Sequence, residues 1–140
     1  DPKVDIVLVR DADSPFTMGE RLAVDEWLAS TYPFHVIRDH ILHSEPMMAG
    51  LWGGWTGLLP SLGHMIANFD RGDSGRYADQ KFLRLAVWPR IRAATLAHDR
   101  HYRLGETRPT AGFAGMHNRH VGGAWPRAMM VGAARAKEKS

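Results

Sequence analysis

Two aspartates one residue apart follow an apolar run near the start of the chain, and carboxylates at this spacing can hold a divalent cation. The run spans 4–9, and Asp11 and Asp13 come shortly after it. In an extended segment, residues two apart point to the same face, so we expect the two carboxylates to converge. Such hard oxygen ligands suit Mn²⁺ or Mg²⁺, which keep coordination positions open for phosphates. The alternative is a polar turn in which Asp13 or Ser14 caps the next helix.

A second charged group lies in the segment "FHVIRDHILH", which begins with the alternating pattern of a strand. Arg38, Asp39 and His40 at its end form a reasonable wall for an anionic ligand. His35, His40 and His43, with the carboxylates of Asp39 and Glu45, also raise the possibility of a histidine-based metal site. The alternative is that these histidines bind backbone groups in a loop.

Two further groups have side chains or backbone suited to a sugar. "GLWGGWTG" predicts a buried glycine-rich loop: Gly53 and Gly54 would allow close approach of a ligand, and Trp52 offers a flat apolar face. Its alternative is an ordinary core tryptophan. Asp79 and Gln80 stand at the start of a predicted helix, where they either hydrogen-bond ligand hydroxyls or interact with the helix dipole.

A late segment, "HNRHVGG", contains His117, Arg119, His120 and Gly122. These residues are able to reach a metal-bound diphosphate, and the alternative is a loop packed on the core.

The elements that must position these residues alternate between strands and helices, which predicts an α/β fold with a small mixed sheet and flanking helices. Strands are expected at 4–9, where the run is apolar enough to be covered on both faces, and at 34–39. Helices are expected at about 18–29, 60–69 and 77–96, the last kinked at Pro89. Residues 98–125 are predicted to be loop-like, with room for one or two short strands. One domain of 1–130 and a basic, disordered tail at 131–140 complete the organisation.

Composition narrows the classes of partner. The net charge is +3 over 140 residues, but the basic residues are scattered, which argues against nucleic-acid binding. The chain has no cysteine, so it has no thiolate site. The segment 47–67 contains too many glycines for a membrane span. The start "DPKVD" is not typical of a signal peptide, and we expect a cytoplasmic protein.

The order of the motifs carries more information than any one of them. The succession "VRDADS", "FHVIRDHILHSEPMMAGLWGG", "YADQKFL" and "HVGG" resembles the C-terminal half of bacterial GT-A-type glycosyltransferase-like proteins. It is similar to the DxD-containing domain often associated with tetratricopeptide-repeat sugar transferases. The resemblance spans about 4–123, with Pro15 where relatives commonly have arginine and Lys81 where they have a second aspartate.

The resemblance implies a metal-dependent domain that binds the diphosphate of a nucleotide sugar. Asp11 and Asp13 would bind the ion with His120 near it, and Asp79 and Gln80 are the catalytic candidates because the family's "DQD" segment contacts sugar hydroxyls. The other residues expected to contact the ligand are Arg10, Arg38, Asp39, His40, Trp52, Gly53, Gly54, His120 and Gly122.

The part of a GT-A fold that grips the nucleotide base precedes the DxD motif, and only a few residues do so here, so we expect this domain to be incomplete as an enzyme on its own. The alternative is a non-catalytic interaction module. Exposed strand edges are templates for pairing with another chain, so this alternative predicts a homo-oligomer.

Overall fold

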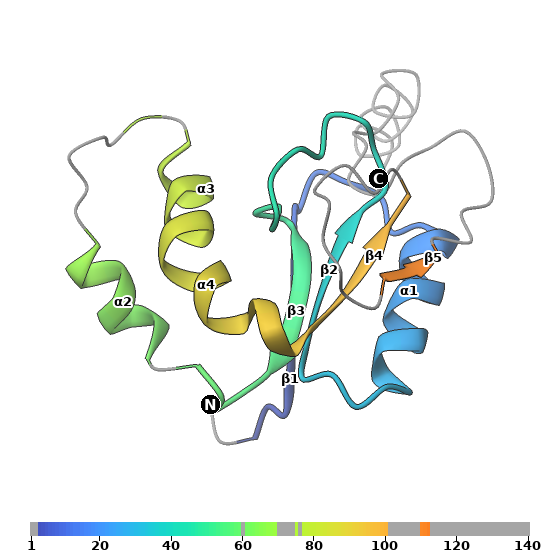
Figure 1. The fold of residues 1–140 in the computed structure, drawn as a ribbon, viewed down its shortest axis with the longest axis horizontal. Helices are drawn as coiled ribbons and strands as arrows, with labels where there is room; N and C mark the ends of the chain where they lie inside the picture. The colour runs from blue at the N-terminus through green and yellow to red at the C-terminus, as the bar shows by residue number, and fades with distance from the viewer. Residues whose placement is uncertain (1–2, 60, 70–74, 76, 101–109, 113–140) are drawn as a thin grey trace, which may run out of the picture.

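A five-stranded mixed sheet with helices on both faces forms the centre of the molecule (Figure 1). The computed structural model describes residues 3–59, 61–69, 75, 77–100 and 110–112. In chain order the elements are β1 (Ile6–Arg10), α1 (Met18–Leu28), β2 (Phe34–Arg38), β3 (Leu51–Trp55), α2 (Leu62–Asn68), α3 (Ala78–Phe82), the π-helical turn η1 (Leu83–Val87), α4 (Trp88–Ile91), the 3₁₀ turn η2 (Arg92–Ala94), β4 (Thr95–Asp99) and β5 (Thr110–Gly112). The predicted α/β class with a small mixed sheet is confirmed. No helix among the described residues has the length and apolar character needed to cross a bilayer.

The strand order β1-β3-β2-β4-β5 places the ends of several strands at one edge of the sheet. β3 runs antiparallel to both β1 and β2, whereas β4 is parallel to β2 and β5 is parallel to β4. The carboxyl ends of β1, β2 and β4 therefore meet at the same edge. Ligands of open α/β sheets bind outside such an edge, so this is where a site is expected.

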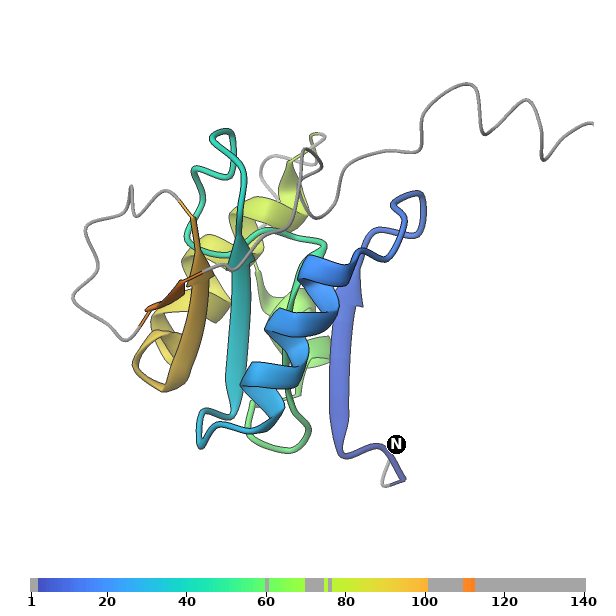
Figure 2. The same ribbon diagram turned by 90° about the vertical axis from the view of Figure 1, so that its right-hand side faces the viewer.

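Helices cover the two faces unequally. α1 lies on one face, and α2, α3 and α4 lie on the other (Figures 1 and 2). The packed residues on the α1 face are Ala23, Val24, Trp27, Ile37, Leu51 and Leu96. The larger core on the opposite face consists of Phe34, Val36, Met47, Trp52, Leu83, Val87, Trp88, Ile91 and Ala97. The two cores hold the sheet rigid beneath its carboxyl edge.

Helix α1 begins with a side-chain cap at Thr17. The Thr17 hydroxyl oxygen accepts a hydrogen bond of 3.1 Å from the backbone N–H of Glu20. Thr17 is therefore the cap, and Asp13 and Ser14 are not used in that way.

The long helix predicted for 77–96 is wrong at its end and irregular in its middle. Pro89 has no N–H to donate to the carbonyl one turn earlier, and the turn just before it widens, with the N–H of Trp88 donating to the carbonyl of Leu83. The helical segment ends at Ala94. Thr95–Asp99 then forms the buried strand β4, which the sequence reading missed.

The glycine-rich loop predicted around "GLWGG" is also wrong, since these residues form β3 in the middle of the sheet. A Cβ on Gly54 would lie 2.5 Å from Cδ1 of Phe34, and one on Gly53 would lie 2.9 Å from Cδ2 of His35. Both glycines are required because side chains of the neighbouring strand occupy the space above them. Trp52 is buried in the core, as the alternative interpretation had it.

β1 is a strand, but not one covered on both faces. It is the first strand in the sheet order, with only β3 beside it. Val7 is 39% exposed and Leu8 44% exposed, on opposite faces of the strand. The expected double coverage is wrong because no described element packs over these side chains.

Candidate functional site

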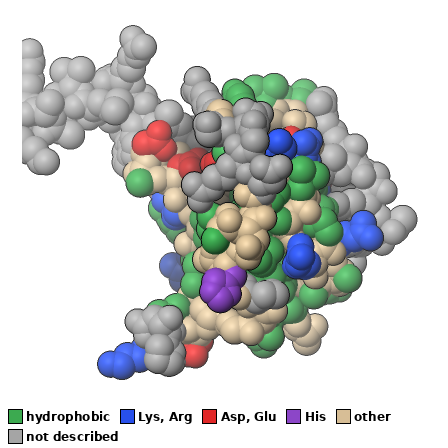
Figure 3. Space-filling view, turned by 90° about the vertical axis from the view of Figure 1, so that its left-hand side faces the viewer, with side chains coloured by type: hydrophobic (Ala, Val, Ile, Leu, Met, Phe, Trp, Pro, Cys, Tyr) green, Lys and Arg blue, Asp and Glu red, His purple; other side chains and the backbone are tan. Residues whose placement is uncertain are grey.

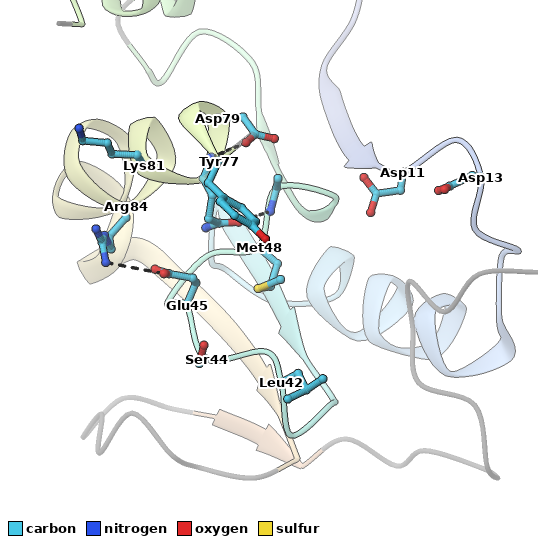
Figure 4. Close-up of a pocket in the computed structure, with 12 residues that line it drawn as sticks. Asp11, Asp13, Leu42, Ser44, Glu45, Met48, Tyr77, Asp79, Lys81 and Arg84 are labelled. Atoms are coloured by element: carbon cyan, nitrogen blue, oxygen red, sulfur yellow. Dashed lines mark hydrogen bonds and ion pairs between the residues drawn. The ribbon is translucent and has the colours of Figure 1, made fainter. Parts of the chain in front are cut away.

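A cavity of about 790 Å³ lies at the carboxyl edge of the sheet and joins three segments far apart in the sequence (Figure 4). The turn after β1, the loop between β2 and β3, and the start of the α3–η1 helical segment all contribute. The lining residues are Asp11, Asp13, Leu42, Ser44, Glu45, Met48, Ala49, Tyr77, Asp79, Gln80, Lys81 and Arg84. The structure thus brings Asp11 and Asp13 together with Asp79 and Gln80.

Asp11 and Asp13 lie in a turn and not in a strand, because β1 ends at Arg10. The same-face argument for a strand was therefore wrong, although in Figure 4 both side chains point from the turn toward the cavity. The carboxylate of Asp11 lies against Gly50, where an added Cβ would sit 2.5 Å from its Cγ. Neither carboxylate is engaged in a hydrogen bond or ion pair with another described residue. Both are exposed and available to a ligand.

Arg10 holds this turn from beneath and does not line the cavity. Its Nε and Nη2 each donate to a different carboxylate oxygen of Glu20 at 2.8 Å, which is a bidentate ion pair. The guanidinium also donates to the carbonyls of Ser14 and Pro15, at 3.2 and 3.4 Å. Arg10 therefore fixes the path of the chain just after the aspartates. The sequence predicted that it would contact the ligand, but its guanidinium is engaged by Glu20 and by backbone carbonyls.

Gln80 holds a loop in place on the other side of the cavity, as Arg10 does on the first. Its amide nitrogen donates to the carbonyl of Met47, and its amide oxygen accepts from the N–H of Ala49 at 3.1 Å. The side chain thereby joins α3 to the loop that precedes β3. Asp79 is exposed, and its Oδ1 accepts from the N–H of Gln80 at 2.7 Å, leaving its other oxygen for a ligand.

Positive charge lines the same cavity, and the sequence reading did not place it there. Arg84 Nη1 lies 3.6 Å from Glu45 Oε1 in a partly exposed ion pair. Among the described residues, Lys81 has no ion-pair partner. Elsewhere, on the molecular face turned to the viewer in Figure 3, lysine and arginine side chains are scattered among apolar and polar ones. The cavity thus combines carboxylates with two cations. The sequence had grouped Glu45 with the loop histidines and placed Lys81 in the "DQD" position, and no motif predicted Arg84.

The charged residues at the end of β2 do not line this cavity. Arg38 is 2% exposed, with its Nε 3.3 Å from Oδ2 of Asp99 on β4. Asp39 is also buried, with Oδ1 3.4 Å from Nδ1 of His43. They form an internal network beneath the carboxyl edge, whereas the sequence predicted a ligand-binding wall.

His40 binds a backbone group within its loop, which was the alternative to a metal or ligand contact. Its Nδ1 accepts a hydrogen bond of 3.1 Å from the backbone N–H of Leu42. Its ring lies edge-on to that of His43, with 5.5 Å between centroids. The contact with Leu42 shapes the loop that leads to the cavity.

His35 is buried between Trp27 and His98. Its ring stacks on Trp27 with 4.4 Å between centroids and meets His98 edge-on at 5.8 Å. Burial, and then the charge of His98, lowers the pKa of His35 from 6.5 to about 3. Burial also lowers the pKa of His98, against the opposing effect of Glu26, whose Oε2 is 3.5 Å from His98 Nε2. Both rings are therefore neutral near pH 7.

Some expectations lie outside the described residues, namely those for His117, Arg119, His120, Gly122 and the tail at 131–140. Within the residues that the structure describes, no set of three or more acidic, histidine or cysteine side chains is arranged to hold a metal ion. Any ion at Asp11 and Asp13 would need further ligands from beyond the described residues, such as a substrate or water. No family model, curated protein or solved structure matches the chain.

Proposed function

We propose that this chain is a metal-dependent glycosyltransferase-like domain that binds the diphosphate of a nucleotide sugar, with the cytoplasm as its location. The observation that supports the proposal best is the single cavity shared by Asp11, Asp13, Asp79, Lys81 and Arg84. Carboxylates suit a divalent cation, and the two basic side chains suit phosphate oxygens.

The residues present fit a small hard cation whose coordination sphere is completed by the bound substrate and water. Mg²⁺ and similar ions are commonly held by one or two carboxylates plus substrate phosphates and water. Asp11 and Asp13 supply two carboxylates, and Gly50 leaves room for the first of them. When bound, such an ion supplies Lewis-acid stabilisation of the departing diphosphate.

The chain's own residues would bind and orient the ligand. Lys81 and Arg84 line the cavity and would attract phosphate oxygens, and Asp79 would offer a carboxylate oxygen to a sugar hydroxyl. Arg10 and Gln80 act as positioning residues, because they fix the two loops that carry the cavity walls. In the family that the sequence resembles, another half of the fold grips the base, so the proposal concerns binding of the metal and diphosphate.

Thermal unfolding tests this proposal through ligand-linked stabilisation. With Mn²⁺ and UDP together at about a hundred times the dissociation constant, stability should rise by about 3 kcal/mol. For a chain of this length that is a rise in Tm of roughly 8 °C. Asp11→Asn should lose most of the rise, whereas Asp25→Asn, in the exposed pair with Arg21 on α1, should keep it. An equal rise in both variants, or no rise in the wild type, would contradict the proposal.

Gly50→Ala is a second test of the metal site, and it removes no carboxylate from the chain. The added methyl group would occupy the position of the Asp11 carboxylate, which is the end of a mobile side chain and can rotate away. We therefore expect the free energy of unfolding to change by less than about 1 kcal/mol, while affinity for Mn²⁺ with UDP falls about tenfold. Unfolding and titration calorimetry measure the two effects, and unchanged affinity would show that Asp11 does not bind the ion from its present position.

The exposed edge of β1 favours a second candidate, a self-associating interaction module. Ile6, Val7 and Leu8 are each about two-fifths exposed, and no proline or charge interrupts them. Unprotected edges of this kind pair with other chains. This candidate predicts a homodimer in sedimentation equilibrium that Leu8→Lys converts to a monomer. A wild-type monomer at high micromolar concentration would remove it.

A further inference from the structure

Tyr77 is an exposed aromatic side chain that the packing of the fold does not use. It is 72% exposed, and its side chain has no hydrogen bond or ring contact with another described residue. By comparison, Phe82 at the end of α3 meets Phe69 edge-on, with 5.3 Å between ring centroids. Of the described residues that line the cavity at the carboxyl edge, Tyr77 is the one aromatic. A large ring left open to solvent at a cavity is available to a ligand.

The backbone that carries this ring is held on both sides. The Tyr77 carbonyl accepts a hydrogen bond of 2.9 Å from the N–H of Lys81, which closes the first turn of α3. The same turn contains Gln80, whose amide group is tied to the backbone of Met47 and Ala49. The position of the ring therefore depends on the side-chain torsions of Tyr77 alone. A tyrosine has few such torsions, so a ligand that fixes it costs little conformational entropy.

Apolar side chains line the cavity together with Tyr77. They are Met48, Ala49 and Leu42, of which Leu42 is 75% exposed. Figure 4 shows the Tyr77 ring over Met48, and thioethers pack well on aromatic rings. A nucleobase is flat and aromatic and carries no sugar hydroxyls, so its faces suit a wall of this kind. A sugar ring needs polar partners for its hydroxyls, and this part of the wall offers few.

We propose that Tyr77 stacks on the nucleobase of a nucleoside diphosphate bound in this cavity. The inference rests on the proposed diphosphate site, and it adds to that site a place for the base within this chain. Stacking reads the flat face of the ring, which every base has, and not its hydrogen-bonding edge. Tyr77 would therefore make the cavity select nucleotides over other diphosphates, with little preference among bases.

Two diphosphates that differ in the base test the proposal by calorimetric titration with Mn²⁺ present. UDP carries uracil, whereas ribose 5-diphosphate has the ribose and the diphosphate alone. We expect the wild type to bind UDP about tenfold more tightly, as one stacked base allows. Tyr77→Leu should lower the affinity for UDP to that for ribose 5-diphosphate. Tyr77→Phe keeps the aromatic face and should keep the difference, as should Trp55→Leu, at an exposed aromatic residue outside this cavity.

A second readout reports the stacking itself. With Mg²⁺ in place of Mn²⁺, the uracil proton resonances of UDP should shift upfield on binding to the wild type and not on binding to Tyr77→Leu. Equal affinities of the wild type for the two diphosphates would overturn the base subsite and leave the diphosphate site standing. An equal loss of both affinities in Tyr77→Leu would also overturn it, because Tyr77 would then act on the diphosphate or the ribose. Binding of neither diphosphate would contradict the proposed function and, with it, this inference.

Discussion

Acidification from about pH 6.5 to about pH 4.5 should lower the free energy of unfolding by about 2 kcal/mol through His35 alone. The pKa of His35 is about 3 in the folded chain and 6.5 in the unfolded chain. Between these values the unfolded state binds a proton that the folded state excludes, so stability is lost as the pH falls. His98 acts in the same direction because its pKa is also lowered. Urea unfolding at a series of pH values measures the slope.

His35→Phe provides the matched variant for this prediction. Phenylalanine keeps a flat ring against Trp27 and removes the titrating group. Over the same pH range, the free energy of unfolding of the variant should fall by about 2 kcal/mol less than that of the wild type. His64→Phe is the comparison variant, since it makes the same substitution at an exposed histidine on α2, outside the core. A His35→Phe slope equal to that of the wild type would show that His35 is not the buried neutral ring.

Gly54→Ala should destabilise the protein by about 2 kcal/mol. The new methyl group would sit 2.5 Å from Cδ1 and 2.8 Å from Cε1 of Phe34. Phe34 is 5% exposed and belongs to the larger core, so its ring has little room to move. Denaturant unfolding measures the loss.

Gly63→Ala is the control for that substitution. It lies inside α2, where an added Cβ would meet only the Ser61 hydroxyl oxygen at 3.7 Å. Alanine is favoured over glycine in a helix, so this variant should gain about 0.5 kcal/mol. If both variants had the same stability, the close packing of β2 against β3 would be wrong.

The elements that the sequence predicted well are those with a strong local signal. The helix that starts after Thr17 follows its capping pattern, and the strand at "FHVIR" follows its alternation. β3 was missed because glycine disfavours strands by itself. Its glycines are explained only by Phe34 and His35 on the neighbouring strand, which is a tertiary contact that local propensity does not contain. β4 was missed because the helical pattern before it continues into its first residues.

The candidate site was predictable in part. The resemblance placed Asp11, Asp13, Asp79 and Gln80 in one site, and the structure places all four at one cavity. Arg10 was expected to contact the ligand, but in the structure it forms a bidentate ion pair with Glu20. The local sequence did not reveal this pair because the fold brings the two residues together from positions ten apart. The cationic wall was missed as a whole: Lys81 was noted only as a departure from the "DQD" pattern, and Arg84 belongs to no motif.

The central claim is that Asp11 and Asp13 hold a divalent cation together with a diphosphate. The most direct measurement is paramagnetic broadening of ¹⁵N-amide resonances by substoichiometric Mn²⁺ in the presence of UDP. The account predicts that broadening is strongest for Asp11, Asp13 and Gly50, extends to Asp79, and is reversed by excess Mg²⁺. Broadening centred on any other part of the chain, or the same pattern in Asp11→Asn, would contradict it.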